Sequence, residues 1–456
     1  MPMARIFFAL GLLGLFAGAR VAATDWQPQW SALVERGEQD SNIGVIVVHA
    51  DASGAVFVGG EFNRDNHKHG ARLRFENDGR FAWMHEHAVG DTAGVELLAD
   101  GRFAEVGVSF DAVYTVFVRV YDGGSGDLIW ERGSTLGRLD LDERGRASAL
   151  AQSPSGDLLV RLSDPATGDY VVVRYAADGS DLAPWRWHAG ADARASAIAA
   201  LADGGAVVTG IGDALDGGYA SVRFDASGNV LFHDLEPGAH GSPLGPAFVA
   251  VAADGGIVLA GTPEASPLGV PEATIWKLDA DGARAWTTVL GVSDDFPLGR
   301  DLAAFALTGD GGVLVATDAT FDRGSGYRLV RLAVEDGHLD WMAPLSFSNG
   351  LFTGTLHALA AGDGGRILGV GRVNSEDLPF ARAIELTADG AACRSHDDSA
   401  LFHWQAATAG SQGWTLAGPA STGIVVQRFD ATGACDGAAD VVFVDGFEPS
   451  AQHGNE

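Results

Sequence analysis

The fold is decided by residues 195–232, which read ASAIAALADGGAVVTGIGDALDGGYASVRFDASGNVLF. An Asp-Gly pair at residues 203–204 and a Ser-Gly pair at residues 227–228 each separate two short runs of small, β-branched and aromatic residues. A glycine-containing turn between two such runs is typical of a β-hairpin. The stretch therefore predicts four antiparallel strands, with two tight turns and one longer connection between the second and third strands.

This unit recurs eight times, about 51 residues apart. The first turns end at Gly54, Gly101, Gly156, Gly204, Gly255, Gly311, Gly364 and Gly413. The second turns end at Gly79, Gly126, Gly179, Gly228, Gly282, Gly337, Gly390 and Gly433. Repeats of 40–50 residues built from short strands are typical of a β-propeller, with one blade per repeat. We therefore predict an all-β propeller of about eight four-stranded blades, with seven as the alternative if one weak unit fails.

The eighth unit lacks a fourth strand, because Gly433 is followed by the sequence ACDG. Near the other terminus, WSALV at residues 30–34 resembles WTTVL at residues 286–290, which is a fourth strand. Closing a ring with a strand from the far terminus removes free sheet edges that would invite aggregation. We predict that this N-terminal strand completes the eighth blade.

Two strand positions carry the same chemistry in most units. Five residues before the second turn glycine stand basic residues, with Glu385 as the exception: Arg74, Arg174, Arg223, Lys277 and Arg428, joined by Arg119 and Arg331. Four residues after it stand aromatic residues: Trp83, Trp130, Phe232, Trp286 and Trp341, with Trp185 or Trp187 in unit three. We interpret the bases as structural, with heads that meet neighbouring acids, and the aromatics as packing between blades.

The N-terminus is typical of an export signal. Arg5 precedes an apolar run at residues 6–16, and small residues before Thr24 offer a cleavage site. Arg20 interrupts the run before it reaches the roughly 20 apolar residues of a membrane span. We expect a signal peptide at 1–23, a propeller domain at 24–436 and a tail at 437–456, in a periplasmic or extracellular protein without membrane insertion.

The chain has 60 acidic and 30 basic residues, for a formal net charge of -30. A polyanion of this size repels phosphate backbones, so we expect no nucleic-acid partner. An excess of acidic residues also keeps an exported protein soluble. We further expect the protein to be a monomer.

Two family resemblances follow from the repeats. Residues 203–232 and 277–291 resemble the glycine-rich propeller repeats of bacterial secreted proteins, the SBBP repeats and their delta-sixty-like relatives. That resemblance implies a propeller in an extracytoplasmic setting and no particular activity. Residues 120–130, VYDGGSGDLIW, are similar to the blade-docking motif of pyrroloquinoline-quinone-type propellers. Those enzymes use adjacent cysteines and calcium. This chain has no adjacent cysteines, so the resemblance implies the blade architecture alone, as in non-enzymatic scaffold members.

Histidines gather in the first unit at His67, His69, His85 and His87. A hairpin centred near Asp78 would place His87 opposite His69, and His85 and His87 share one strand face. Imidazole clusters bind zinc, copper or nickel, so these four residues are a candidate site for a divalent metal ion. The alternative is a polar rim without a ligand.

The two cysteines, Cys393 and Cys435, permit one disulfide in an oxidising compartment. Equivalent sites on neighbouring blades diverge toward the rim, whereas a disulfide needs Cα atoms within about 7 Å. We predict a disulfide between Cys393 and Cys435, which requires that the chain after Gly433 folds toward blade seven.

Acidic residues mark the connections between second and third strands: Glu61, Asp65, Asp111, Asp164, Asp169, Asp213, Asp216, Glu264, Glu272, Asp318, Asp322, Glu376 and Asp377. A ring of acids on one face would favour cations or basic partners. Our leading hypothesis is an exported, non-catalytic propeller that binds or scaffolds a protein or carbohydrate. The alternative is an extracytoplasmic lyase or hydrolase, for instance one acting on polysaccharide, with its site at the central mouth of the propeller.

Overall fold

The structure is a computed structural model of the chain. It describes residues 26–35, 41–64, 67–88, 91–109, 113–139, 148–212, 218–236, 248–265, 271–290, 298–321, 324–345, 347, 354–374, 379–399, 401, 403–410, 413–420 and 423–430. Nearly all regular structure in these ranges is β-strand, apart from the short 3-10 helix η1 (Asp363–Gly365). The described residues contain no helix long and apolar enough to cross a membrane.

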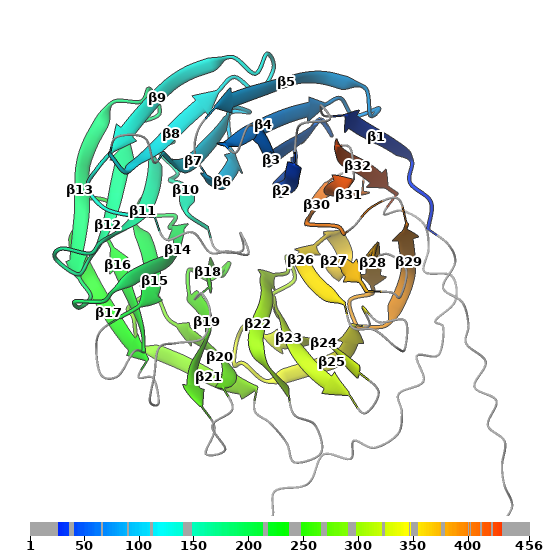
Figure 1. Ribbon diagram of the computed structural model, residues 1–456. Coiled ribbons are helices and arrows are strands. Elements are labelled where there is room, and N and C mark those ends of the chain that lie inside the picture. The colour runs from blue at the N-terminus through cyan, green and yellow to red at the C-terminus, as the bar shows by residue number, and fades with distance from the viewer. Residues whose placement is uncertain are drawn as a thin grey trace, which may run out of the picture.

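Eight antiparallel sheets of four strands stand in a ring, which confirms an eight-bladed β-propeller (Figure 1). Blade one contains β2 (Ser41–Ala50), β3 (Val56–Arg64), β4 (His67–Phe75) and β5 (Phe81–Ala88). Blade two contains β6 (Asp91–Leu97), β7 (Phe103–Ser109), β8 (Thr115–Tyr121) and β9 (Leu128–Ser134). Blade three contains β10 (Leu150–Gln152), β11 (Leu158–Asp164), β12 (Asp169–Tyr175) and β13 (Asp181–His188). Blade four contains β14 (Arg194–Ala200), β15 (Ala206–Ile211), β16 (Tyr219–Phe224) and β17 (Val230–Glu236).

The second half of the ring repeats this order. Blade five contains β18 (Phe248–Val251), β19 (Ile257–Ala265), β20 (Pro271–Leu278) and β21 (Arg284–Leu290). Blade six contains β22 (Leu298–Leu307), β23 (Gly312–Phe321), β24 (Gly324–Ala333) and β25 (Leu339–Leu345). Blade seven contains β26 (Thr355–Ala361), β27 (Ile367–Val373), β28 (Phe380–Leu386) and β29 (Ala392–Asp398). Blade eight contains β30 (Ala406–Gly410), β31 (Gly413–Ala420), β32 (Gly423–Phe429) and β1 (Trp30–Glu35).

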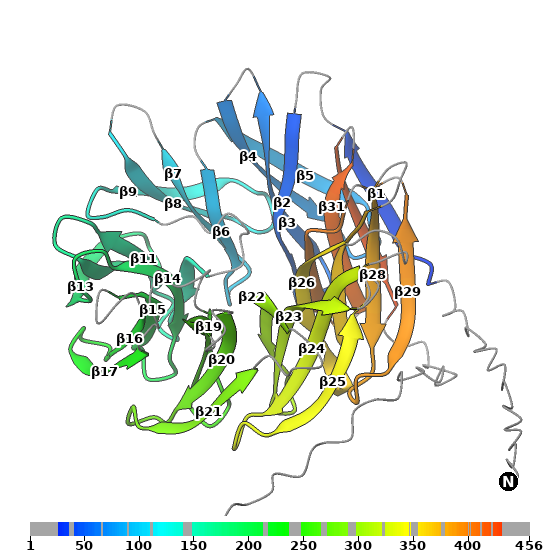
Figure 2. The same cartoon turned by 60° about the horizontal axis from the view of Figure 1, so that its bottom comes forward.

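The N-terminal strand closes the ring, as predicted. β1 pairs antiparallel with β32, in a register that runs from Trp30 opposite Arg428 to Glu35 opposite Gly423. Figures 1 and 2 show the blue β1 beside the last strands of the chain. The outer strand of blade eight therefore comes from the opposite end of the sequence, and the described strands leave no seam in the ring.

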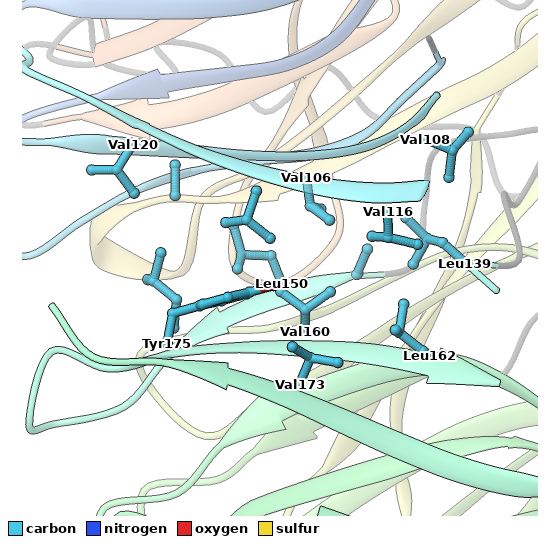
Figure 3. Close-up of a cluster of buried hydrophobic side chains, with 14 of the residues drawn as sticks. Val106, Val108, Val116, Val120, Leu139, Leu150, Val160, Leu162, Val173 and Tyr175 are labelled. Atoms are coloured by element: carbon cyan, nitrogen blue, oxygen red, sulfur yellow. The ribbon is translucent and has the colours of Figure 1, made fainter. Parts of the chain in front are cut away.

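The core lies between blades, where the sheet faces meet. Between blades two and three, Val106 and Val116 face Val160 and Val173, and all four are buried (Figure 3). β-Branched side chains fit the pleated surface of a sheet, and burial of each contributes about 1.5–3 kcal/mol. The same kind of contact recurs around the ring, so each blade is stabilised mainly by its two neighbours.

Adjacent blades are also joined by polar contacts at the second tight turn. In blade five, Trp286 Nε1 and Lys277 Nζ donate to the same backbone oxygen of blade six, that of Val334, at 3.0 and 3.1 Å. Trp341 and Arg331 converge in the same way on the oxygen of Ala388. Three further blades repeat elements of this contact: Trp83 and Arg74 reach Gly124 O, Trp30 and Arg428 reach Asn77 O, and Arg223 reaches Ala280 O.

These contacts confirm the structural interpretation of the repeated bases. Their heads also meet acids, as in the ion pairs Lys277–Asp254 and Arg331–Asp310. In these five blades the head therefore spans from its own blade to the next one and docks them together. In blades two and three, Arg119 and Arg174 form ion pairs with Glu131 and Asp157 of their own blade.

Blade seven reverses the pattern, which explains why Glu385 breaks it. Glu385 is fully buried in β28 and accepts a hydrogen bond from Arg394 Nε at 2.6 Å. Arg394 stands in β29 where other blades carry an aromatic residue, and it donates to Asp430 O at 2.9 Å. In blade seven the base therefore stands on the fourth strand instead of the third, and it still contacts the next blade.

The second-turn glycines cannot be replaced without cost. Gly179 has φ +84°, and an added Cβ would lie 2.7 Å from the indole of Trp130 on the preceding blade. Gly101 has the same left-handed backbone, φ +82°, but nothing within 4 Å of such a Cβ. We expect Gly101→Ala to cost about 1–2 kcal/mol of unfolding free energy through backbone strain alone. Gly179→Ala should cost roughly 1–3 kcal/mol more through overpacking.

Urea unfolding of the two single variants measures this difference. Equal destabilisation by Gly101→Ala and Gly179→Ala would contradict the role of the indole contact.

Candidate functional site

The propeller has two chemically different faces. Every blade has the same antiparallel strand order. The connections between strands one and two and between strands three and four therefore lie on one face, here called the turn face. Those between strands two and three leave the opposite face, here called the loop face. The innermost strands, β2, β6, β10, β14, β18, β22, β26 and β30, surround the axis (Figure 1).

Carboxylates on the turn face are part of the fold. Asp225 Oδ1 accepts the backbone N–H groups of Ser227 and Asn229 at 2.9 and 2.8 Å, an arrangement that fixes the turn. The pKa of Asp254 is lowered by its hydrogen bonds from Lys277 and from the Gly256 N–H group. Much of the acid excess on this face is therefore engaged in turns and docking contacts.

Three of the thirteen loop acids have described side chains: Glu61, Asp164 and Asp169. Seven lie outside the described residues: Asp65, Asp111, Asp213, Asp216, Asp322, Glu376 and Asp377. The side chains of Glu264, Glu272 and Asp318 are likewise outside the description. The complete acidic ring stays a prediction, and the three described members give its local chemistry.

In blade three two of these acids hold one cation. Arg186 Nη1 lies 2.9 Å from Asp164 Oδ2 and 3.3 Å from Asp169 Oδ2. His188 Nδ1 lies 3.2 Å from the other oxygen of Asp169. The hydrogen bond from Arg186 lowers the pKa of Asp164 below its ordinary value. Carboxylates from the ends of β11 and β12 thus converge on a guanidinium at this face.

In blade one the third described acid is partly buried. Burial raises the pKa of Glu61, while the nearby Lys68 opposes this and Asp91 adds to it. Lys68 Nζ forms an ion pair with Asp91 Oδ1 at 2.6 Å, which links β4 to the inner strand of blade two. The cluster therefore combines the carboxyl group of Glu61, which keeps its proton to higher pH, with the carboxylate of Asp91, which is ion-paired.

A cavity of about 180 Å³ opens between the inner strands of blades one to three. Its walls are mostly apolar, and its polar side chains are His49, Glu96 and Ser148. His49 Nε2 lies 3.1 Å from Val95 O. Burial raises the pKa of Glu96, and His49 opposes that rise. Ligand pockets usually measure about 300–1,000 Å³, so this cavity would take part of a ligand.

The sequence contained a signal for this pair that our prediction missed. His49 and Glu96 each stand five residues before the first-turn glycine of their unit. In units three to six the same position holds alanine: Ala151, Ala199, Ala250 and Ala306. His49 and Glu96 replace this alanine in two neighbouring units, which indicates that ionisable side chains line the inner wall there.

The raised pKa of Glu96 predicts how its replacement changes stability with pH. The folded state binds the proton more tightly than the unfolded state, so the contribution of Glu96 is fully present below the unfolded pKa and is lost as pH rises through the folded pKa. Glu96→Gln cannot ionise. We expect the melting temperature of the variant, relative to the natural chain, to be higher at pH 7 than at pH 4. A difference that stays constant or falls with pH would contradict the desolvation of this carboxyl.

The four histidines of blade one do not all meet as predicted. The backbone register pairs His69 with Ala88 and His87 with Gly70, so the expected pairing of His87 with His69 is wrong by one residue. A register shift between Arg74 and Phe75 is the cause. It moves His69 onto the opposite blade face from His85.

The described rings contact other groups. His69 stacks on Phe62 at 5.2 Å between ring centroids, and His85 Nε2 lies 3.3 Å from Ser125 O in blade two. The side chains of His67 and His87 lie outside the description. No group of three or more metal-ligating His, Cys, Asp or Glu side chains occurs among the side chains that are described. The four-histidine metal site stays a prediction.

The disulfide also stays a prediction. Cys393 lies in β29 and is 9% exposed. Cys435 lies beyond residue 430, outside the described residues.

Comparisons with known proteins identify the architecture. No family model matches the chain, and no curated protein matches it. Among solved structures it is similar to one titled "Structure of Dos1 propeller", with a TM-score of 0.56 and 10% identity over 88% of this chain and 95% of that one. It is also similar to quinohemoprotein alcohol dehydrogenase from Comamonas testosteroni, with a TM-score of 0.54 and 11% identity over 90% of this chain and 77% of that one. At such identities the likeness shows the β-propeller fold alone, which agrees with the expected quinone-type blade architecture, while the secreted-repeat resemblance stays a prediction.

Proposed function

We propose that the chain is an exported, monomeric, non-catalytic β-propeller whose loop face binds a basic ligand. The observation that carries this proposal is the position of Arg186 between Asp164 and Asp169. Two connection-flanking carboxylates there hold a guanidinium, the kind of group that a basic protein partner presents. The other loop acids would extend the same chemistry around the ring.

The kind of connection on each face supports this choice. Turn-face carboxylates such as Asp225 and Asp254 are engaged by turn N–H groups and docking bases. The loop face is the one from which the longer connections leave, and such connections on a rigid scaffold commonly carry binding residues.

Charge reversal on the loop face tests the proposal. The variant carries Asp65→Lys, Asp111→Lys, Asp213→Lys and Glu376→Lys, with one substitution in each of four blades. The probe is a lysine hexapeptide, whose affinity is measured by calorimetry at fixed ionic strength. We expect the affinity to fall more than tenfold, because the loop acids create the attractive potential.

A control with the same net charge separates the face from the overall charge. It carries Asp127→Lys, Asp181→Lys, Asp281→Lys and Glu335→Lys, which are exposed acids at the turn face. The control should keep at least half of the natural affinity. Equal losses in both variants would show that only net charge attracts the peptide, and unchanged binding by the loop variant would reject the loop face.

A second candidate function is a lyase or hydrolase acting on polysaccharide, and the cavity with His49 and Glu96 favours it. A carboxyl with a raised pKa beside an imidazole can donate and accept a proton. If this candidate is correct, the mature protein releases product from at least one polysaccharide in a broad panel. Glu96→Gln should then lower that rate by about 10²–10⁴-fold. Absence of product with every polysaccharide would exclude it.

The proposed export has its own test. When the full chain is expressed in a secreting bacterium, mass spectrometry of the exported protein should find Thr24 at the N-terminus. An intact Met1 on all of the protein would overturn the signal peptide.

A further inference from the structure

Arg372 lies beside two histidines at the loop-face end of blades seven and eight and forms no ion pair with an acid that the structure describes. His357 belongs to the inner strand β26, Arg372 lies near the end of β27, and His403 precedes β30. The register pairs Thr355 with Arg372, which places both at the end of the hairpin away from its tight turn. A hydrogen bond of 3.2 Å from Trp404 N to Gly371 O holds the segment of His403 against β27.

The three side chains are close to one another. The rings of His357 and His403 have their centroids 4.8 Å apart and are inclined by 32°. The positive charge of Arg372 acts on His403. Together with burial it lowers the pKa of His403 to about 4, so the imidazole is neutral at pH 7. Arg372 is then the fixed charge of the cluster.

Two polar atoms of this cluster are buried without a hydrogen-bond partner: Arg372 Nε and His403 Nδ1. A buried donor without a partner costs about 1–3 kcal/mol, more when the group is charged. Five other arginines also have a buried Nε without a hydrogen bond, but each of them forms an ion pair with an acid: Arg72, Arg74, Arg174, Arg223 and Arg331. Two further arginines are held by backbone oxygens. Arg161 Nη1 donates to Ala195 O at 2.6 Å, and Arg428 Nη2 donates to Gly54 O at 2.7 Å. Arg372 has no such partner among the described residues, so its half-buried guanidinium needs an explanation.

We propose that Arg372, His357 and His403 bind an oxyanion, the carboxylate or phosphate group of a ligand, at the loop-face end of blades seven and eight. The guanidinium supplies the charge and its unused N–H donors, which suit planar and tetrahedral oxyanions. His403 supplies a further N–H donor in its Nδ1-protonated tautomer. This site lies on the same face as the proposed acidic ring, but it is tested with anions and not with a basic peptide, so the two proposals can fail separately.

Histidine-labelled mature protein provides the test, with the ring signals assigned from the variants His357→Gln and His403→Gln. Sodium acetate or inorganic phosphate is added at pH 7 and at constant ionic strength, with chloride as the reference salt. We expect saturable shifts of the His357 and His403 signals with at least one of the two anions, and the anion that binds more tightly identifies the ligand class. In Arg372→Gln the affinity should fall at least tenfold.

Two controls separate the loss of the anion site from a general loss of positive charge and from unfolding. Arg194→Gln removes an exposed base at the same face and should leave the affinity unchanged. Arg372→Gln should melt within a few degrees of the natural chain, because Arg372 makes no hydrogen bond or ion pair with the residues that the structure describes. If this variant does not fold, Arg372→Lys replaces it; lysine keeps the charge and should bind the anion more weakly. Shifts no larger than those with chloride, or an affinity unchanged by replacement of Arg372, would overturn the site.

Discussion

Deletion of residues 24–35 from the mature protein is expected to abolish the closed ring. The segment joins three blades: Trp26 N donates to Ser395 O of blade seven at 3.2 Å, Gln29 N donates to Arg428 O of blade eight at 2.7 Å, and Trp30 Nε1 donates to Asn77 O of blade one at 3.1 Å. The buried Trp26 also packs on Phe429, with ring centroids 4.5 Å apart. Loss of these contacts and of β1 should cost more than about 5 kcal/mol, a large part of the stability of a typical domain.

Urea unfolding and size-exclusion chromatography measure the effect of the deletion. A synthetic peptide of residues 24–36, added in trans, should restore a cooperative transition, because it can pair again with β32. A deleted protein that unfolds at the natural urea concentration would contradict the closure.

Point variants refine this result. Trp30→Ala should cost about 3–5 kcal/mol, as large-to-small substitutions at packed aromatics do. Leu33 lies on the same strand and is 47% exposed, so Leu33→Ala should change the free energy of unfolding by less than about 0.5 kcal/mol.

The second large effect is expected at Glu385. Its carboxylate lies 3.0 Å from Arg366 Nη1, 2.6 Å from Arg394 Nε and 2.8 Å from Trp414 Nε1. Glu385→Ala would leave two arginines without their acid in and beside the core. Breaking a buried ion pair in this way costs about 3–5 kcal/mol.

An exposed acid in a comparable contact is the control. Glu131 accepts from Arg119 Nε at 2.7 Å, but its side chain is 46% exposed. Glu131→Ala should cost less than about 1 kcal/mol, because a surface ion pair contributes little. Equal losses on urea unfolding would argue against Glu385 as the centre of the network.

Most of the architecture could be predicted because each blade is specified by short sequence signals that recur in every unit. Each tight turn has its own glycine signal, and the spacing of Trp286 and Lys277 from Gly282 recurs with the blades. The closing strand at residues 30–34 was recognisable because it repeats the sequence of a fourth strand. Eight repeats supply many weak signals that agree, so the fold prediction does not fail when one unit matches the pattern poorly.

Features that depend on contact between units were not predictable in the same way. In blade seven the acid Glu385 stands on the third strand and the base Arg394 on the fourth, and Arg394 makes the docking contact with the next blade. The sequence of neither strand alone predicts this arrangement. The pairing of His69 with Ala88 follows from one register shift in a hairpin, which turn residues alone do not specify. The approach of His49 to Glu96 requires knowing which inner strands are neighbours.

Hydrogen–deuterium exchange of the mature protein with and without the lysine hexapeptide tests the central proposal most directly. The peptide should slow exchange in segments that flank the connections of the loop face, among them residues 61–64 and 162–170. Exchange at turn-face segments such as residues 225–229 should not change. Protection confined to the turn face, or protection nowhere at saturating peptide, would contradict a loop-face binding module.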